Sequence, residues 1–107
     1  MKRFHLALGV SDVEASADDY SQRLGCRPDL LIPGEYALWR TDAVNVSIRK
    51  VSHEAGAALR HLGWEDPLSP TFSAERDMNG ILWERFTADQ QAAEIRQAWP
   101  STSYHPK

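Results

Sequence analysis

Two histidines and one glutamate stand where they could share a metal ion. His5 and His61 begin the similar segments HLALGV and HLGWED, and Glu84 follows the turn-forming segment DMNG. Two imidazole nitrogens and one carboxylate oxygen form a ligand set that leaves neighbouring coordination positions of a divalent ion open. A single histidine in a strand more often packs or faces solvent. Here the small residues Ala7 and Gly63, two positions after each histidine, keep the same face open and favour metal binding.

The bulk composition is that of one ordinary globular domain. The 107 residues are 42% hydrophobic and 25% charged, with a formal net charge of -3. The lysines and arginines are scattered, so we expect no nucleic-acid partner. The apolar runs are too short to span a bilayer, and the N-terminus lacks a signal-peptide core. We therefore expect no membrane partner. Because the single cysteine, Cys26, cannot form an internal disulfide, we expect a cytoplasmic protein.

Hydrophobic periodicity predicts a β-α-β-β-β arrangement in the first half. Residues 4–10 alternate as in a strand with one apolar face. Ser11 to Glu14 has the spacing of a capping box, and an apolar stripe at helical spacing follows it up to Gly25. Three further strands are predicted, over residues 28–32, 36–40 and 45–50.

The second half repeats this pattern in shortened form. Residues 52–56 are predicted to be a connector, and the strand over 59–64 repeats the histidine and the alternation of the first strand. No helix fits between Glu65 and Gly80. Short strands near 71–75 and over 81–86 are predicted there, and the capping box TADQ begins a helix over 88–99.

Short motifs in both halves carry a family resemblance. They are HLALGVSD, SADDYSQRLG and Pro28 in the first half, and HLGW and DMNGILWE in the second. Their order and spacing, from residue 3 to about residue 87, resemble the vicinal oxygen chelate superfamily, which includes glyoxalase I, extradiol dioxygenases and bleomycin-resistance proteins. The resemblance implies one α+β domain over residues 1–107. In it, two βαβββ-type modules (3–50, and an abbreviated 57–87) form a cupped, incomplete mixed barrel, followed by the C-terminal helix 88–99.

The resemblance also implies a metal site. In that superfamily the ligands come from the first and last strands of each module, which gives His5, His61 and Glu84 here. Fe(II) is the ion most expected, with Mn, Ni or Zn as alternatives. This set is similar to that of the extradiol dioxygenases. Those enzymes also have a tyrosine ten residues before the ligand glutamate, where this chain has Ala74, and this departure counts against full dioxygenase chemistry.

The last strand of the first half departs from the glyoxalase pattern. Where glyoxalase-type members have a fourth ligand, a glutamate, this chain offers Asn45, Ser47 and Arg49. We interpret Arg49 as a catalytic residue together with Glu84, because a guanidinium can hold carboxylate or enolate oxygens of a substrate. The alternatives are that Arg49 is a solvated strand end and that Glu84 pairs with Arg85 or Arg49.

Aromatic and small side chains are expected around the substrate. The residues expected to line the substrate cup are Tyr36, Leu38, Ser47 and Phe86. Trp39 and Trp83 are expected to pack beneath helices. The shortened second half lacks a helix, so one sheet face needs a cover, either the C-terminal helix or a second chain. The sequence does not choose between these covers, and family members commonly pair, so we expect a homodimer.

Three functions are compatible with these features. The first is a small metal-dependent enzyme, dioxygenase-like or lyase- or isomerase-like, that chelates two neighbouring oxygens of a small organic molecule. The second is a metal-free binding module of the same fold that sequesters antibiotics, which would not need the two histidines and the glutamate. The third is a structural or regulatory homodimer that inherited these residues as a relic.

Overall fold

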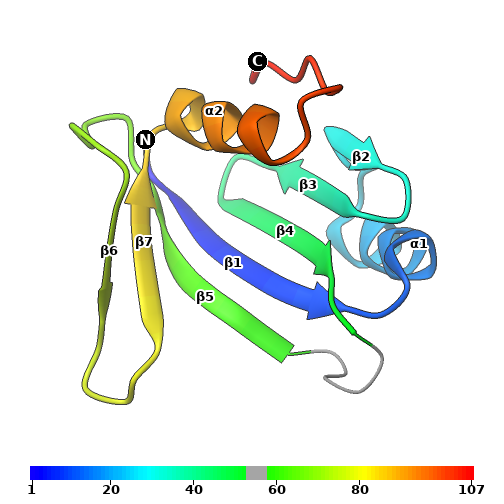
Figure 1. The fold of residues 1–107 in the computed structure, drawn as a ribbon, viewed down its shortest axis with the longest axis horizontal. Helices are drawn as coiled ribbons and strands as arrows, with labels where there is room; N and C mark the ends of the chain where they lie inside the picture. The colour runs from blue at the N-terminus through cyan, green and yellow to red at the C-terminus, as the bar shows by residue number, and fades with distance from the viewer. Residues whose placement is uncertain (53–57) are drawn as a thin grey trace.

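Seven strands and two helices, with one helix on each face of a mixed sheet, make up the described part of the chain (Figure 1). The structure is a computed structural model that describes residues 1–52 and 58–107. In chain order the elements are β1 (Arg3–Val10), α1 (Val13–Leu24), β2 (Leu30–Ile32), β3 (Tyr36–Arg40), β4 (Val44–Lys50), β5 (Ala58–Glu65), β6 (Ser73–Arg76), β7 (Leu82–Phe86) and α2 (Ala88–Ala98). The predicted connector over 52–56 lies, apart from its first residue, outside the described residues.

The sheet has the strand order β2-β3-β4-β1-β5-β7-β6. The two histidine-bearing strands, β1 and β5, lie side by side and run antiparallel. Each has a parallel neighbour on its other side, β4 beside β1 and β7 beside β5. The predicted α+β class and the incompletely closed mixed sheet are confirmed, and the division into two modules stays a prediction. No helix in the described ranges is long and apolar enough to cross a lipid bilayer.

The N-cap of helix α1 lies one residue later than predicted. The N-cap is Asp12, whose Oδ1 accepts a hydrogen bond from the N–H of Ala15 at 3.0 Å, so the capping box predicted from Ser11 is wrong. Glu14 does not close a box. Its carboxylate instead accepts from the N–H of Gly34, in the turn between β2 and β3. The helix ends as predicted at Gly25, which adopts the left-handed conformation with φ of 77°.

One face of the sheet packs against α1. Val13 and Ala17 of the helix meet Trp39 and Ile48 of the strands in one buried cluster. Trp39 is fully buried, as predicted, and its indole N–H donates to the Ser21 hydroxyl at 3.4 Å. Burial of this stripe stabilises the helix, because a helix of this length is marginal without tertiary packing.

Helix α2 lies across the opposite face of the sheet (Figure 1). Its predicted capping box is present: Thr87 accepts from the N–H of Gln90, and the Gln90 side chain accepts from the N–H of Thr87. Ile95 packs against Tyr36 and Leu38 in a second buried cluster. This is the face that carries His5, so the helix closes over the candidate site.

The face opposite α2 has no helix over β5 and β7 among the described residues. The prediction that Trp83 packs beneath a helix is therefore wrong. Its ring contacts Phe4 edge to face at a centroid distance of 6.2 Å, and its indole N–H donates to Asp77 at 2.9 Å. Trp64, in the same cluster, is 38% exposed. Helix α2 cannot cover these rings, because it packs on the other side of the sheet.

We predict that Gly63→Ala costs more than about 3 kcal/mol of unfolding free energy. A Cβ atom there would lie 2.1 Å from the backbone oxygen of Glu84 on β7. Gly9→Ala is the matched control, since its Cβ would meet the Val51 side chain at 2.7 Å, and a side chain can turn away. Urea denaturation measures both variants, and equal costs would contradict the close approach of β5 and β7.

Candidate metal centre

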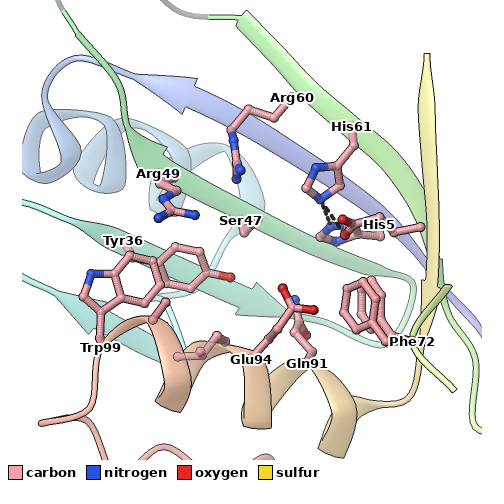
Figure 2. Close-up of a pocket in the computed structure, with 14 residues that line it drawn as sticks. His5, Tyr36, Ser47, Arg49, Arg60, His61, Phe72, Gln91, Glu94 and Trp99 are labelled. Atoms are coloured by element: carbon pink, nitrogen blue, oxygen red, sulfur yellow. Dashed lines mark hydrogen bonds and ion pairs between the residues drawn. The ribbon is translucent and has the colours of Figure 1, made fainter. Parts of the chain in front are cut away.

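Three side chains from neighbouring strands converge on one point of the cup. The Nε2 atoms of His5 and His61 lie 3.0 Å apart, and His61 Nε2 lies 2.9 Å from Glu84 Oε1 (Figure 2). One ligand atom from each of the three residues lies within 4.8 Å of the others, so the group could hold a metal ion. Glu84 therefore faces His61, and Arg85 pairs with Asp66 instead.

The strand register explains this convergence. His5 on β1 pairs with Gly63 on β5, and Gly63 in turn pairs with Glu84 on β7. His61 lies on the same face two residues before Gly63, as the alternation of a strand requires. Gly63 has no side chain, so the backbones of β5 and β7 can approach closely at this position. This close approach brings Glu84 within reach of His61.

Hydrogen bonds fix which nitrogen of His5 faces the cluster. The side-chain nitrogen of Asn45 donates to Glu65 at 2.9 Å and to Gln91 at 2.7 Å, which orients the amide and turns its Oδ1 toward His5. His5 Nδ1 lies 2.9 Å from this Oδ1 and 3.2 Å from the Asn45 carbonyl oxygen. Both are acceptors, so Nδ1 carries the hydrogen. The lone pair of His5 is then on Nε2, which points at His61 and is free for a metal.

An ion-pair network lies beneath Asn45. Glu65 is 2% exposed and accepts from Arg3 at 2.7 Å, from Arg40 at 2.7 and 2.9 Å, and from Asn45. Burial alone would raise the pKa of this carboxyl. Hydrogen bonds from Arg40 and Asn45, with the charges of Arg40 and Arg3, outweigh burial and lower the pKa of Glu65 to about 2.

Aromatic rings pack against one side of His5. The rings of His5 and Phe86 meet edge to face at 4.9 Å, and Phe72 stacks on Phe86 at 5.2 Å. Burial, reinforced by the charge of His61, lowers the pKa of His5 against the opposing effect of the hydrogen bond that His5 donates to Asn45. A neutral imidazole is the form that binds a metal ion.

A cavity of about 100 Å³ lies between the cup and α2. The two histidines and Glu84 line it, as do three of the four residues expected in the substrate cup, Tyr36, Ser47 and Phe86. Leu38 does not line it, although it lies on the same face. It is fully buried against Ile95, because α2 covers that part of the sheet.

Arg49 lines the cavity away from the histidines (Figure 2). Its guanidinium lies over the Trp99 ring at 5.0 Å, and that ring packs on Tyr36 at a centroid distance of 4.8 Å. This contact holds the cation beside the aromatic wall, and an attraction of this kind is worth roughly 0.5–1 kcal/mol at an exposed site.

Two charged residues that sequence reasoning missed also line the cavity, Arg60 on β5 and Glu94 on α2. Regular alternation would place Arg60 on the face opposite His61, and no sequence signal marked the irregularity that changes this. Glu94 is one residue before Ile95 of the apolar stripe, but the sequence did not indicate which sheet face the helix would cover. Burial and the nearby charge of Glu84 raise the pKa of Glu94.

Ser47 occupies the place on β4 that Glu84 occupies on β7. Ala7, two residues after His5, pairs with Ser47, just as Gly63, two residues after His61, pairs with Glu84. A small hydroxyl therefore stands where a symmetric site would have a second carboxylate.

A scan against protein-family models and a search of the curated proteins found no match for this chain.

We predict that Glu65 contributes roughly 2 kcal/mol to the loss of stability between pH 6 and pH 3. Its pKa is lower in the folded protein, so the ionised carboxylate stabilises the fold fully above about pH 4.5. That contribution is lost as the pH falls toward 2. Carboxyl ¹³C NMR should show Glu65 titrating near 2, with urea denaturation at both pH values as the second measurement. A Glu65 midpoint near 4.5 would contradict the proposed strength of the network.

Proposed function

We propose that this protein is a small metal-dependent enzyme of the vicinal oxygen chelate type. His5, His61 and Glu84 would hold one divalent ion in a site with positions left open for a ligand. The observation that carries this proposal is the convergence of the three ligand atoms, with Nε2 of His5 left without a hydrogen by the Asn45 contacts. The proposed α+β layout of two modules, the second one abbreviated, belongs to the same proposal.

The donor set fits a first-row divalent ion. Two imidazoles and one carboxylate suit Fe(II) best, and Mn, Ni and Zn follow. Two features support binding of an ion over a relic site. The second nitrogen of His5 has an acceptor, a feature that tunes metal-binding histidines, and that acceptor is itself held by Glu65 and Gln91. Removing such supporting residues typically costs 10–100-fold in metal affinity.

A bound ion would act as a Lewis acid on two neighbouring oxygens of a small organic ligand. The chain's own residues would supply the rest. Arg49 would orient an anionic ligand from the aromatic wall. Glu94, whose pKa is raised, is suited to accept or return a proton on the α2 side of the cavity. Helix α2 would exclude water from the cup, which strengthens each charged contact within it.

The size of the cavity favours the metal-dependent enzyme over the antibiotic-binding module. Pockets for drug-sized ligands are about 300–1,000 Å³, whereas this cavity is about 100 Å³. An antibiotic would need α2 to move away, so sequestration by a metal-free module is the weaker candidate. The same limit favours small aliphatic ligands over catechols. The expected homodimer and cytoplasmic location stay predictions.

The test is metal content, measured by mass spectrometry on tag-free protein prepared anaerobically and supplied with Fe(II). We predict about one ion per chain in the wild type. His61→Ala should retain less than about a tenth of it, because loss of one of three ligands leaves too few donors. His105→Ala is the matched control, since it removes an exposed histidine of the tail. Wild-type protein that stays free of metal after reconstitution would refute the proposal.

A further inference from the structure

A register shift turns Arg60 toward the candidate site. Ala7 of β1 pairs with His61 of β5, but Leu8 pairs with Leu59, so Arg60 is the extra residue of a bulge. A bulge re-aims a side chain, and such bulges are common next to active sites. Arg60 accordingly lines the same cavity as its neighbour His61, which regular alternation would not allow (Figure 2).

Arg49 and Arg60 are the two arginines without a hydrogen-bond or ion-pair partner within residues 1–52 and 58–107. Each of the others donates to a carboxylate or a carbonyl oxygen; they are Arg3, Arg23, Arg27, Arg40, Arg76, Arg85 and Arg96. Both Arg49 and Arg60 line the cavity. Burial and the like charge of Arg49 lower the pKa of Arg60. Both residues are exposed to solvent, so two guanidinium groups at one cavity have donors available for an oxyanion.

The same end of the cavity offers further donors and space. Tyr36 and Ser47 line it with hydroxyl groups, and burial raises the pKa of the Tyr36 hydroxyl, which keeps it a donor. Ser47 is a small residue at the position on β4 that corresponds to Glu84 on β7. The charges also balance: Arg49 and Arg60 offset Glu84 and Glu94, so a divalent ion would leave two positive charges for a ligand to neutralise.

We propose that Arg49 and Arg60 bind a carboxylate of the ligand, whose other end presents a hydroxyl or carbonyl oxygen and a second carboxylate oxygen to the His5–His61–Glu84 cluster. The ligand class is thus a small hydroxy- or oxo-dicarboxylic acid. This inference rests on the proposed function for the metal end and on the two arginines for the other. The cavity of about 100 Å³ is below the roughly 300–1,000 Å³ of sites for drug-sized ligands, which favours a small acid.

The first experiment examines the arginine end alone, in metal-free protein. Acetate is titrated while the arginine Nε–Hε signals are followed by NMR, with assignments from Arg49→Gln and Arg60→Gln. We expect saturable shifts of the Arg49 and Arg60 signals, and little change for Arg27, which pairs with Asp18 on an exposed surface. Signals of Arg49 and Arg60 that stay fixed, or that move no more than that of Arg27, would overturn the carboxylate site.

The second experiment adds the metal end, with Zn(II) as a diamagnetic ion. Hydroxymalonate and glycolate share a hydroxy acid unit, and hydroxymalonate has one more carboxylate. In the wild type we expect calorimetry to give at least tenfold tighter binding of hydroxymalonate. That ratio should fall to about twofold in the Arg49→Gln/Arg60→Gln variant, since solution chelation by the extra carboxylate is common to both proteins. Arg27→Gln should keep the wild-type ratio.

The outcomes separate the two proposals. An unchanged ratio in the double variant, with Zn(II) bound normally, would overturn the dicarboxylate assignment and leave the metal site standing. Wild-type protein that binds no Zn(II) or Fe(II) would refute the metal-dependent function and with it the dicarboxylate class, while the acetate titration would still decide whether Arg49 and Arg60 bind a carboxylate.

Discussion

The rest of the structure depends on the ion pairs and hydrogen bonds of the buried Glu65 carboxylate. Arg3 of β1, Arg40 of β3 and Asn45 of β4 all donate to this residue of β5. A buried charge is tolerated only when it is paired and hydrogen-bonded, and losing one partner of such a pair typically costs about 3–5 kcal/mol. The network therefore fixes four strands relative to one another at the base of the cup.

That constraint extends to the candidate metal centre through one amide. Asn45 donates to Glu65 and to Gln91 of α2, and its remaining oxygen faces His5. The same side chain thus links the ion-pair network, the covering helix and the imidazole. Buried polar groups that must all be hydrogen-bonded at once favour a single arrangement of the side chains. In the described residues no buried side-chain nitrogen or oxygen lacks a hydrogen-bond partner.

The cup is asymmetric in charge, and this asymmetry limits what it can bind. The metal-binding atoms of His5, His61 and Glu84 lie together where β1, β5 and β7 are neighbours. The Arg49 guanidinium lies over Trp99 of the aromatic wall, and Arg60 lines the same cavity. Helix α2 closes the space between them to about 100 Å³. A small ligand with an anionic group at each end, one for the arginines and one for an ion at the cluster, would fit this arrangement better than a large flat cation.

Sequence alone determined the elements and one face of the site. Alternation and caps are local, so the strands, the α2 capping box and the open face of His5 and His61 could be predicted to within about two residues. Tertiary structure alone decided three other features: the sheet face that α2 covers, the position of Trp83 on the face without a covering helix, and the entry of Arg60 and Glu94 into the cavity. Each depends on contacts between segments distant in sequence. A bulge that shifts register by one residue changes the face of a side chain, and neither residue type nor spacing records that shift.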